Sequence, residues 1–323
     1  MIQRWVCCAA ATVGVLLMAG LAFASEFPSR PVHLIVPYAP GGAVDILART
    51  LGEALAKTWG QQPVIDNRPG AGGIIASAAV VQASPDGYTL IIVASGHPVN
   101  QFLYANLPYD TFRDFTPIME LASSPNVILV NKNFPAKTLQ ELIDMARAKP
   151  GSLSYGMPGN GTSGHLAGEL LKYMAKVDIV AIPYRGGAPE LTALIASEIP
   201  MSINVVTESM AHIKNDSVRA LAVTTAQRST ALPDIPTVSE AGVAGYDTGV
   251  WWGLLGPAGM APDLVDKLHR DFTTALHDPT VQARLVNLGA TMVANTPSEF
   301  AISLHAQAAR WEPVIRAAHI APQ

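Results

Sequence analysis

Short apolar runs alternate along the chain with segments whose apolar residues recur every three or four positions. The first such segment, 45–59, has leucines one helical turn apart and is followed by Gly60, which predicts an amphipathic helix ended by a glycine. Uninterrupted apolar runs are typical of strands covered on both faces of a sheet. The runs that we interpret as strands are 32–36, 63–65, 89–93, 127–130, 179–182, 218–223 and 251–255. Strands and helices in alternation predict an α/β fold of mostly parallel sheets flanked by helices.

Further signals mark where other helices begin. Thr138 lies three residues before Glu141, and a second threonine–glutamate pair of the same spacing begins at Thr296. This spacing matches the capping box, in which a hydroxyl and a carboxylate bind the free amides at a helix start. Pro279 follows an aspartate, and proline favours the first helical position because an N–H would have no partner there. We expect a helix to begin at each of these places.

The chain shows no internal repeat and no low-complexity linker, although its length allows two domains. Two domains on a single tether usually have a polar stretch rich in glycine, proline and serine between them. We therefore predict two lobes joined by crossing strands within 124–131 and 248–257. Lobe 1 is expected to comprise residues 25–125 plus 252–323, and lobe 2 residues 126–251.

The N-terminus has the three parts of a secretory signal. A short positively charged start is followed by an apolar run over 5–21 and by Ala22-Phe23-Ala24, small residues of the kind that precede cleavage. A membrane anchor is the alternative, but the apolar run is short for a span and no polar stop-transfer cluster follows it. We predict a signal peptide over residues 1–24 that is removed on export.

Composition narrows the possible chemistry. Both cysteines, Cys7 and Cys8, lie inside the predicted signal peptide, so the mature chain must fold by burying a core without disulfides. The formal net charge is −4 and there is no basic tract, which argues against nucleic acid and anionic lipid as partners. The eight histidines are scattered without a metal-binding spacing, so we expect neither a metal nor a cofactor.

The first glycine-rich turn follows the first predicted strand and precedes the first predicted helix. Glycines let the main chain adopt unusual dihedrals and let a ligand approach it closely. The free amides of the following helix favour an anion in that place. An ordinary tight turn with a capped helix is the alternative. The candidate binding residues are Tyr38, Pro40, Gly41, Gly42, Ala43 and Asp45.

A second glycine-rich turn repeats this arrangement in the predicted lobe 2. Its glycines match G-x-G-x-x-G, but Asp178 comes too early for the acid of a dinucleotide-binding unit. No lysine follows, so it is not a phosphate-binding Walker loop either. A loop of small polar residues suits a small anion, with a purely structural turn as the alternative. The candidate binding residues are Gly159, Asn160, Gly161, Thr162, Ser163 and His165.

Two such turns, one in each lobe, would close on a carboxylate if they faced each other across a cleft. Three further segments could complete the pocket. Two follow predicted strands, and the third is Trp251-Trp252 at the predicted crossing between the lobes, which could wall the cleft or pack in the core. Arg185 could hold a second carboxylate with its forked guanidinium, or it could be an ordinary solvated arginine. The additional candidates are Ser95, His97, Asn100, Tyr184, Arg185 and Gly186. No nucleophile motif is present, since Ser163 is followed by Gly164 and His165, and we predict no catalytic residue.

These motifs, taken in order, resemble the Bug-type substrate-binding proteins of tripartite tricarboxylate transporters. The resemblance begins with Pro-Gly-Gly-x-x-Asp after the first strand and extends over nearly the whole mature chain. The other segments that support it are 67–73, 84–90, 159–165, 183–189, 236–242, 252–254 and 257–259.

The resemblance implies a periplasmic two-lobed binding protein of the type II class that delivers a small organic acid to a membrane permease. It also implies that backbone amides and water at two opposed loops, 38–45 and 159–165, hold the ligand carboxylate. Where the family commonly has an acid, this chain has Asn204, which keeps hydrogen bonding but not the charge. Asn204 therefore argues against amino-acid ligands and leaves dicarboxylates, aromatic acids and amides.

Three functions remain open from the sequence. The first is a monomeric, non-enzymatic receptor that serves a permease. The second is a receptor of the same fold that presents its ligand to a sensor kinase. The third is an exported hydrolase or isomerase that uses His97 or His165 as a base.

Overall fold

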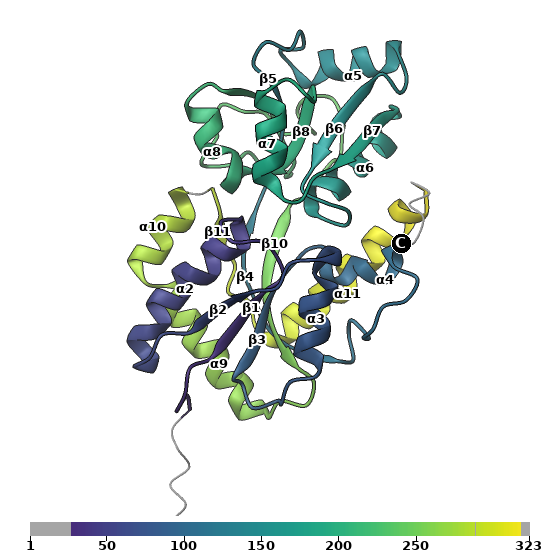
Figure 1. The fold of residues 1–323 in the computed structure, drawn as a ribbon. Helices are drawn as coiled ribbons and strands as arrows, with labels where there is room; N and C mark the ends of the chain where they lie inside the picture. Colours follow the sequence, from purple (N-terminus) through teal and green to yellow (C-terminus); the bar gives the residue numbers. More distant parts are fainter. Residues whose placement is uncertain (1–26, 288, 318–323) are drawn as a thin grey trace, which may run out of the picture.

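The computed structural model describes residues 27–287 and 289–317, which form two β-sheets flanked by helices and stacked one above the other (Figure 1). We call the six-stranded sheet with its helices lobe 1 and the five-stranded sheet with its helices lobe 2. The predicted signal peptide, residues 1–24, lies outside the described residues.

The lobe 1 sheet has the strand order β11-β4-β10-β3-β1-β2. Its strands are β1 (His33–Val36), β2 (Val64–Asn67), β3 (Thr89–Ala94), β4 (Phe115–Ser124), β10 (Val250–Pro257) and β11 (Thr291–Met292). Its helices are α2 (Ala43–Trp59), α3 (Ile74–Val81), α4 (Asn100–Leu103), α9 (Pro262–Leu276), α10 (Pro279–Asn287) and α11 (Pro297–Ala317), with short 3₁₀ turns at Ala71–Gly73 and His97–Val99. One core cluster lies under α2 and α9 and a second lies under α3 and α11.

The lobe 2 sheet has the order β7-β6-β8-β5-β9. Its strands are β5 (Asn126–Asn131), β6 (Leu153–Met157), β7 (Ile179–Pro183), β8 (Met201–Val205) and β9 (Val218–Val223). Its helices are α5 (Leu139–Ala148), α6 (Ser163–Ala175), α7 (Gly187–Ile195) and α8 (Val206–Lys214). Both faces carry a buried apolar cluster, as expected from the uninterrupted apolar runs in the sequence.

The two lobes are joined where β4 continues into β5 and where the chain returns along β10 (Figure 1). The strands β1, β2 and β3 pair in parallel, as do β6, β7 and β8. The crossing strands add antiparallel pairs, because each enters a sheet from the opposite lobe. Each sheet is therefore mixed, and each of these parallel pairs includes β1 or β6, the strand that leads into the glycine-rich turn of its lobe. The lobe boundaries at 125 and 251 stay predictions.

The helix α11 is shared between the lobes. Phe300 and Leu304, in its first half, are buried in a lobe 1 cluster. Trp311 and Ile315, in its second half, are buried in the lobe 2 cluster beneath α6. The end of the chain thus adds a third connection, although the sequence pattern assigned it to lobe 1 alone.

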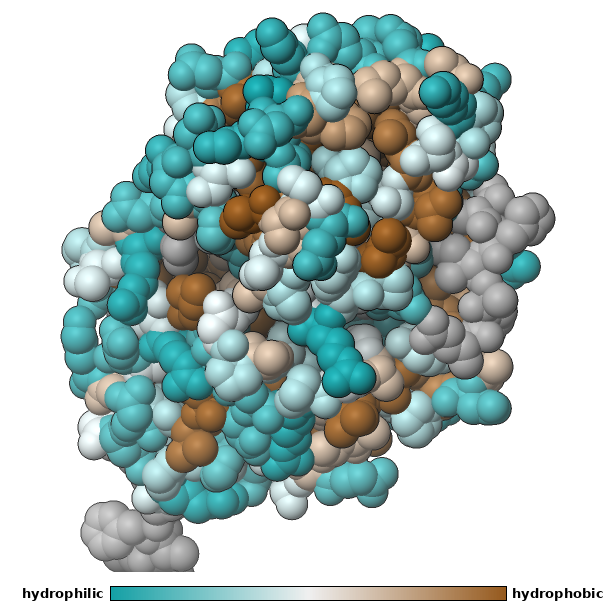
Figure 2. All heavy atoms as spheres, turned by 45° about the horizontal axis from the view of Figure 1, so that its top comes forward, coloured by the Kyte–Doolittle hydropathy of each residue, from teal (hydrophilic) through white to brown (hydrophobic). Residues whose placement is uncertain are grey.

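The surface is mostly polar. On the face drawn in Figure 2, hydrophobic residues appear as small separate groups among hydrophilic ones. Within the residues that the structure describes, no helix combines the length and apolar character that a membrane span needs.

Candidate functional site

The glycine-rich turn of lobe 1 connects β1 to α2 and is held together by Asp45. The carboxylate of Asp45 accepts hydrogen bonds from Gly41 N and Arg49 Nε, both at 2.9 Å, and from Asn67 Nδ2 at 3.0 Å. Burial alone would raise the pKa of Asp45, but the hydrogen bonds from Arg49, Gly41 and Asn67 together lower it. Gly41 has φ +86°, a conformation that favours glycine. Asp45 therefore stabilises the conformation of the loop through these hydrogen bonds.

The amides at the start of α2 face an acid of lobe 2. Ala43 N donates a 3.0 Å hydrogen bond to Oε1 of Glu208, a residue in the first turn of α8. A Cβ atom at Gly42 would lie 3.4 Å from the same oxygen. The predicted anion-binding site of lobe 1 is thus already occupied by a carboxylate from lobe 2.

Glu208 did not emerge from the sequence as a candidate. The signal that could have identified it is its position: it lies four residues after Asn204, one helical turn beyond the end of a buried strand. Its partner is 165 residues away in sequence, so the contact depends on how the lobes meet.

The glycine-rich turn of lobe 2 connects β6 to α6. Thr162 Oγ1 donates to Gly159 O at 2.7 Å, and Gly161 N donates to Nδ1 of His165 at 3.1 Å. His165 is buried, which lowers the pKa of its imidazole. Because Nδ1 accepts a hydrogen bond, the ring proton of the neutral form is on Nε2. Ser163 Oγ donates to Asn126 Oδ1 at 2.8 Å, which ties the start of α6 to a crossing strand.

The two lobes approach closely at this turn. A Cβ atom at Gly96 would lie 2.5 Å from Gly161 O, and one at Gly161 would lie 3.5 Å from Asn100 Oδ1. Asn100 is buried and donates to Gly72 O at 3.1 Å, while its Oδ1 has no hydrogen-bond partner among residues 27–287 and 289–317. Ser95 Oγ is likewise buried without a partner in the same ranges. Segment 95–100 therefore forms the lobe 1 wall opposite Gly161.

Two of the predicted residues lie in aromatic surroundings. The ring of His97 stacks on Tyr109, with centroids 5.9 Å apart, and meets Phe115 edge-on at 5.0 Å. Burial lowers the pKa of His97 to about 4, so its imidazole is neutral at physiological pH. Tyr38 packs against the lobe 1 core, and burial with the nearby Tyr109 and Tyr104 raises its pKa to about 12.

The segment after β7 borders the lobe 2 turn. Tyr184 N donates to Met157 O at 2.9 Å, and Gly186 N donates to Pro158 O at 3.1 Å. Arg185 is exposed, so its role in holding a second carboxylate stays a prediction. Asn204 is fully buried, accepts from Val205 N at 2.7 Å and donates to Gly187 O at 3.4 Å. Asn160 is half-buried and Pro40 is exposed.

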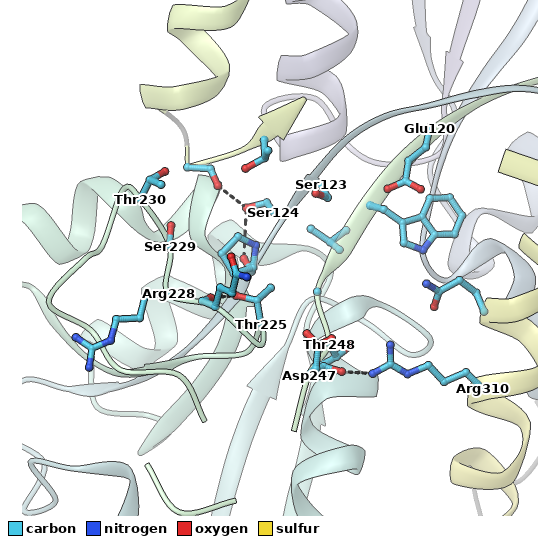
Figure 3. A pocket seen from close by; sticks show the side chains of 18 residues that line it. Glu120, Ser123, Ser124, Thr225, Arg228, Ser229, Thr230, Asp247, Thr248 and Arg310 are labelled. Carbon is cyan, nitrogen blue, oxygen red and sulfur yellow. Dashed lines mark hydrogen bonds between the residues drawn. The ribbon is translucent and has the colours of Figure 1, made fainter. Parts of the chain in front are cut away.

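A separate cavity of about 510 Å³ lies at the crossing strands (Figure 3). None of the predicted binding residues lines it. Its walls include Glu120, Trp251 and Arg310, of which Arg310 donates to Asp247 O. Burial raises the pKa of Glu120 to about 7. Over the described part of the chain, no three acidic, histidine or cysteine side chains gather as metal ligands.

Comparisons with known proteins agree on one family. A model of the tripartite tricarboxylate transporter family receptor matches residues 47–320. The protein BugT of Bordetella pertussis is 32% identical over 312 residues, which cover 95% of this chain and 96% of the relative.

Two solved structures show bound acids. A structure described as R. palustris Rpa4515 with adipate has a TM-score of 0.88 and 37% identity, covering 92% of this chain and all of the other. MatC of Rhodopseudomonas palustris with bound malate has a TM-score of 0.84 and 33% identity, covering 90% of this chain and all of the other.

Proposed function

This chain belongs to the tripartite tricarboxylate transporter receptor family, a family of periplasmic solute receptors and not of enzymes, and we propose that it binds a small carboxylate-bearing metabolite between its lobes. The ligand would be held mainly by backbone amides and ordered water, with no cofactor. The resemblance to Bug-type receptors is confirmed by the family match and by BugT.

One observation carries the proposal: each glycine-rich turn meets the opposite lobe. Gly42 and Ala43 of lobe 1 lie against Glu208, and Gly161 of lobe 2 lies against Gly96 and Asn100. Both turns open helices, α2 and α6, whose first amides lack partners within the helix. Each turn therefore brings a helix start to the boundary between the lobes, and a helix start favours an anionic group.

The class of ligand follows from the chemistry of this region and from the two structures with acids. Adipate and malate are the ligands of similar receptors, and both are short aliphatic acids. The cleft region offers mostly amides and small polar groups, which suit a carboxylate without demanding a cationic partner. We therefore expect the ligand to be a small organic acid and not a polymer or a lipid.

We further propose that residues 1–24 direct export, that the mature protein acts as a monomer, and that it delivers its ligand to a membrane permease. The family description names a transporter receptor, which supports the permease as partner. A receptor of this kind must release its ligand at the membrane, so the closed arrangement of the lobes must be reversible.

The test is isothermal titration of the mature protein with a panel of organic acids, amino acids and amides. We expect one ligand per chain and a smaller radius of gyration in its presence. Gly161→Ala is the informative variant, since a Cβ atom there would lie 2.7 Å from Leu103 Cδ1. Gly245→Ala is its control, because Gly245 has φ +78° against +75° for Gly161 and no atom within 4 Å of its Cβ position.

We expect Gly161→Ala to lose at least about tenfold in affinity, equal to 1.4 kcal/mol, and Gly245→Ala to bind like the unchanged protein. No heat with any compound, or turnover of one of them by the purified protein, would contradict the proposal.

A further inference from the structure

We propose that Glu208 determines which acids the cleft accepts. The geometry points to a ligand that has one carboxylate and, at its other end, a hydrogen-bond donor such as an amide, hydroxyl or amine. A ligand with a second carboxylate in that position would be disfavoured. This inference rests on the proposed function, since it concerns the same cleft.

The first step is that protein carboxylates already occupy the lobe 1 amides. Glu208 Oε1 accepts from Ala43 N at 3.0 Å, and Asp45 Oδ2 accepts from Gly41 N at 2.9 Å. A ligand carboxylate that sought these amides would have to displace Glu208. The start of α6 in lobe 2 is the remaining helix terminus for the ligand carboxylate.

The second step is that Glu208 has an unused acceptor. Its Oε2 atom is buried and makes no well-formed hydrogen bond among the described residues, although the Asn204 side chain lies close enough to offset in part the rise that burial causes in the pKa of Glu208. Leaving a buried carboxylate oxygen unpaired is costly, because the group has lost its hydration without a replacement. A donor on the ligand would provide that replacement.

The third step is that the position of Glu208 is fixed. A Cβ atom at Gly187 would lie 1.7 Å from Glu208 Oε2 and 2.6 Å from Asn204 Nδ2. The carboxylate therefore packs directly over the backbone of Gly187, where only glycine leaves room. Asn204 is fully buried beside it. Glu208 thus places a carboxyl group one helical turn after Asn204.

The fourth step is a second acid in the same lobe. Glu190 is fully buried and its Oε1 accepts from Ser202 Oγ, while its Oε2 has no partner in the part of the chain that the structure describes. Within the described ranges, no lysine or arginine forms an ion pair with Glu190 or Glu208. Burial raises the pKa of both carboxyl groups, so a nearby donor would stabilise their charged forms whereas a further carboxylate would not.

The test uses three probes with the same six-carbon chain: adipate, its monoamide and 6-aminohexanoate. They share one carboxylate and differ only in the group at the other end. Isothermal titration of the unchanged protein is expected to show the monoamide or the amino acid binding at least about tenfold tighter than adipate, as one hydrogen bond to a charged group would give. The same three end groups on four-, five-, seven- and eight-carbon chains extend the series.

Glu208→Gln keeps the shape of the side chain and replaces one oxygen by a donor. We expect Glu208→Gln to reduce the preference for the monoamide or the amino acid over adipate by about tenfold or more, mostly through tighter binding of adipate. Glu208→Ala removes both oxygens and is expected to lose the preference as well, and circular dichroism melting shows that each variant is folded. Glu198→Gln is the control, since Glu198 is exposed and the change in net charge is the same.

The outcomes separate this inference from the proposed function. If the protein binds members of the series but prefers the dicarboxylates, or if Glu208→Gln leaves the preference unchanged, Glu208 does not set specificity and the receptor function stands. If neither protein binds any member of any length, the proposed function fails and this inference fails with it.

Discussion

Gly96 of lobe 1 and Gly161 of lobe 2 approach so closely that a single methyl group at residue 96 would lie 2.5 Å from the Gly161 carbonyl oxygen. Real Cβ atoms do not tolerate that distance, so one of the two backbones would have to move. The close approach of the lobes at this point thus depends on the absence of a side chain at residue 96.

We expect Gly96→Ala to hold the lobes apart. Gly96 has φ −71°, which alanine adopts without strain, so the effect is the contact and not the local backbone. Small-angle scattering should show a larger radius of gyration, and ligand affinity should fall at least about tenfold. Gly52→Ala is the control, because its Cβ atom would make only ordinary contacts at 3.5 Å. Identical scattering and affinity in the two variants would contradict this account of closure.

His165 is expected to act as a structural acceptor for the lobe 2 turn. His165→Phe keeps a flat ring but leaves the buried Gly161 N without its partner. Urea unfolding should show a loss of about 1–2 kcal/mol, the usual cost of an unpaired buried amide. His277→Phe, a change at an exposed histidine, serves as the comparison and should change stability by far less. Equal stability of His165→Phe and the unchanged protein would show that the turn does not need this bond.

Glu120 should make stability depend on pH. Burial raises its pKa to about 7 from an ordinary 4.5. Between these values the folded protein keeps a proton that the unfolded chain has released, so stability falls as pH rises through this window. Glu120→Gln cannot ionise and should melt higher than the unchanged protein at pH 8. At pH 4 the two should melt alike, and a pH-independent difference would rule out this role for the carboxyl group.

Trp311 should stabilise contact between α11 and lobe 2. It is 3% exposed and lies in the lobe 2 cluster, so Trp311→Ala removes a large buried ring and should cost about 3–5 kcal/mol. Calorimetry measures this loss. Ile302→Ala, on the same helix at a side chain that is 70% exposed, should cost little. A small effect of Trp311→Ala would mean that α11 is not anchored in lobe 2.

The sequence was informative wherever local chemistry determines the structure. The helix start at Thr138 could be predicted because its hydroxyl accepts from Glu141 N, three residues on. Gly41 and Gly161 could be identified as turn residues because each follows a strand and precedes a helix. The short strand β11 and the strand β4, whose apolar residues are interrupted by Thr116, Pro117 and Glu120, lack an uninterrupted apolar run, and neither was predicted.

Contacts between residues far apart in the chain could not be predicted from the sequence. His97 was a binding candidate because it follows a strand, but Tyr109 and Phe115 surround its ring, and neither shows a periodic relation to it. Glu208 was missed for the same physical reason, since its partner amide belongs to the other lobe. The antiparallel pairs of β10 likewise follow from the return path of the chain and not from its composition.

The last helix has a mechanical consequence. The helix α11 is buried at Phe300 in lobe 1 and at Trp311 in lobe 2. Separating the lobes directly would therefore expose one of these side chains to water. Rotation of one lobe about the long axis of α11 would keep both side chains buried, whereas a wide hinge opening would expose one of them to water. The intrinsic motion of this receptor should therefore be a twist of one lobe over the other, with a ligand entering from the side.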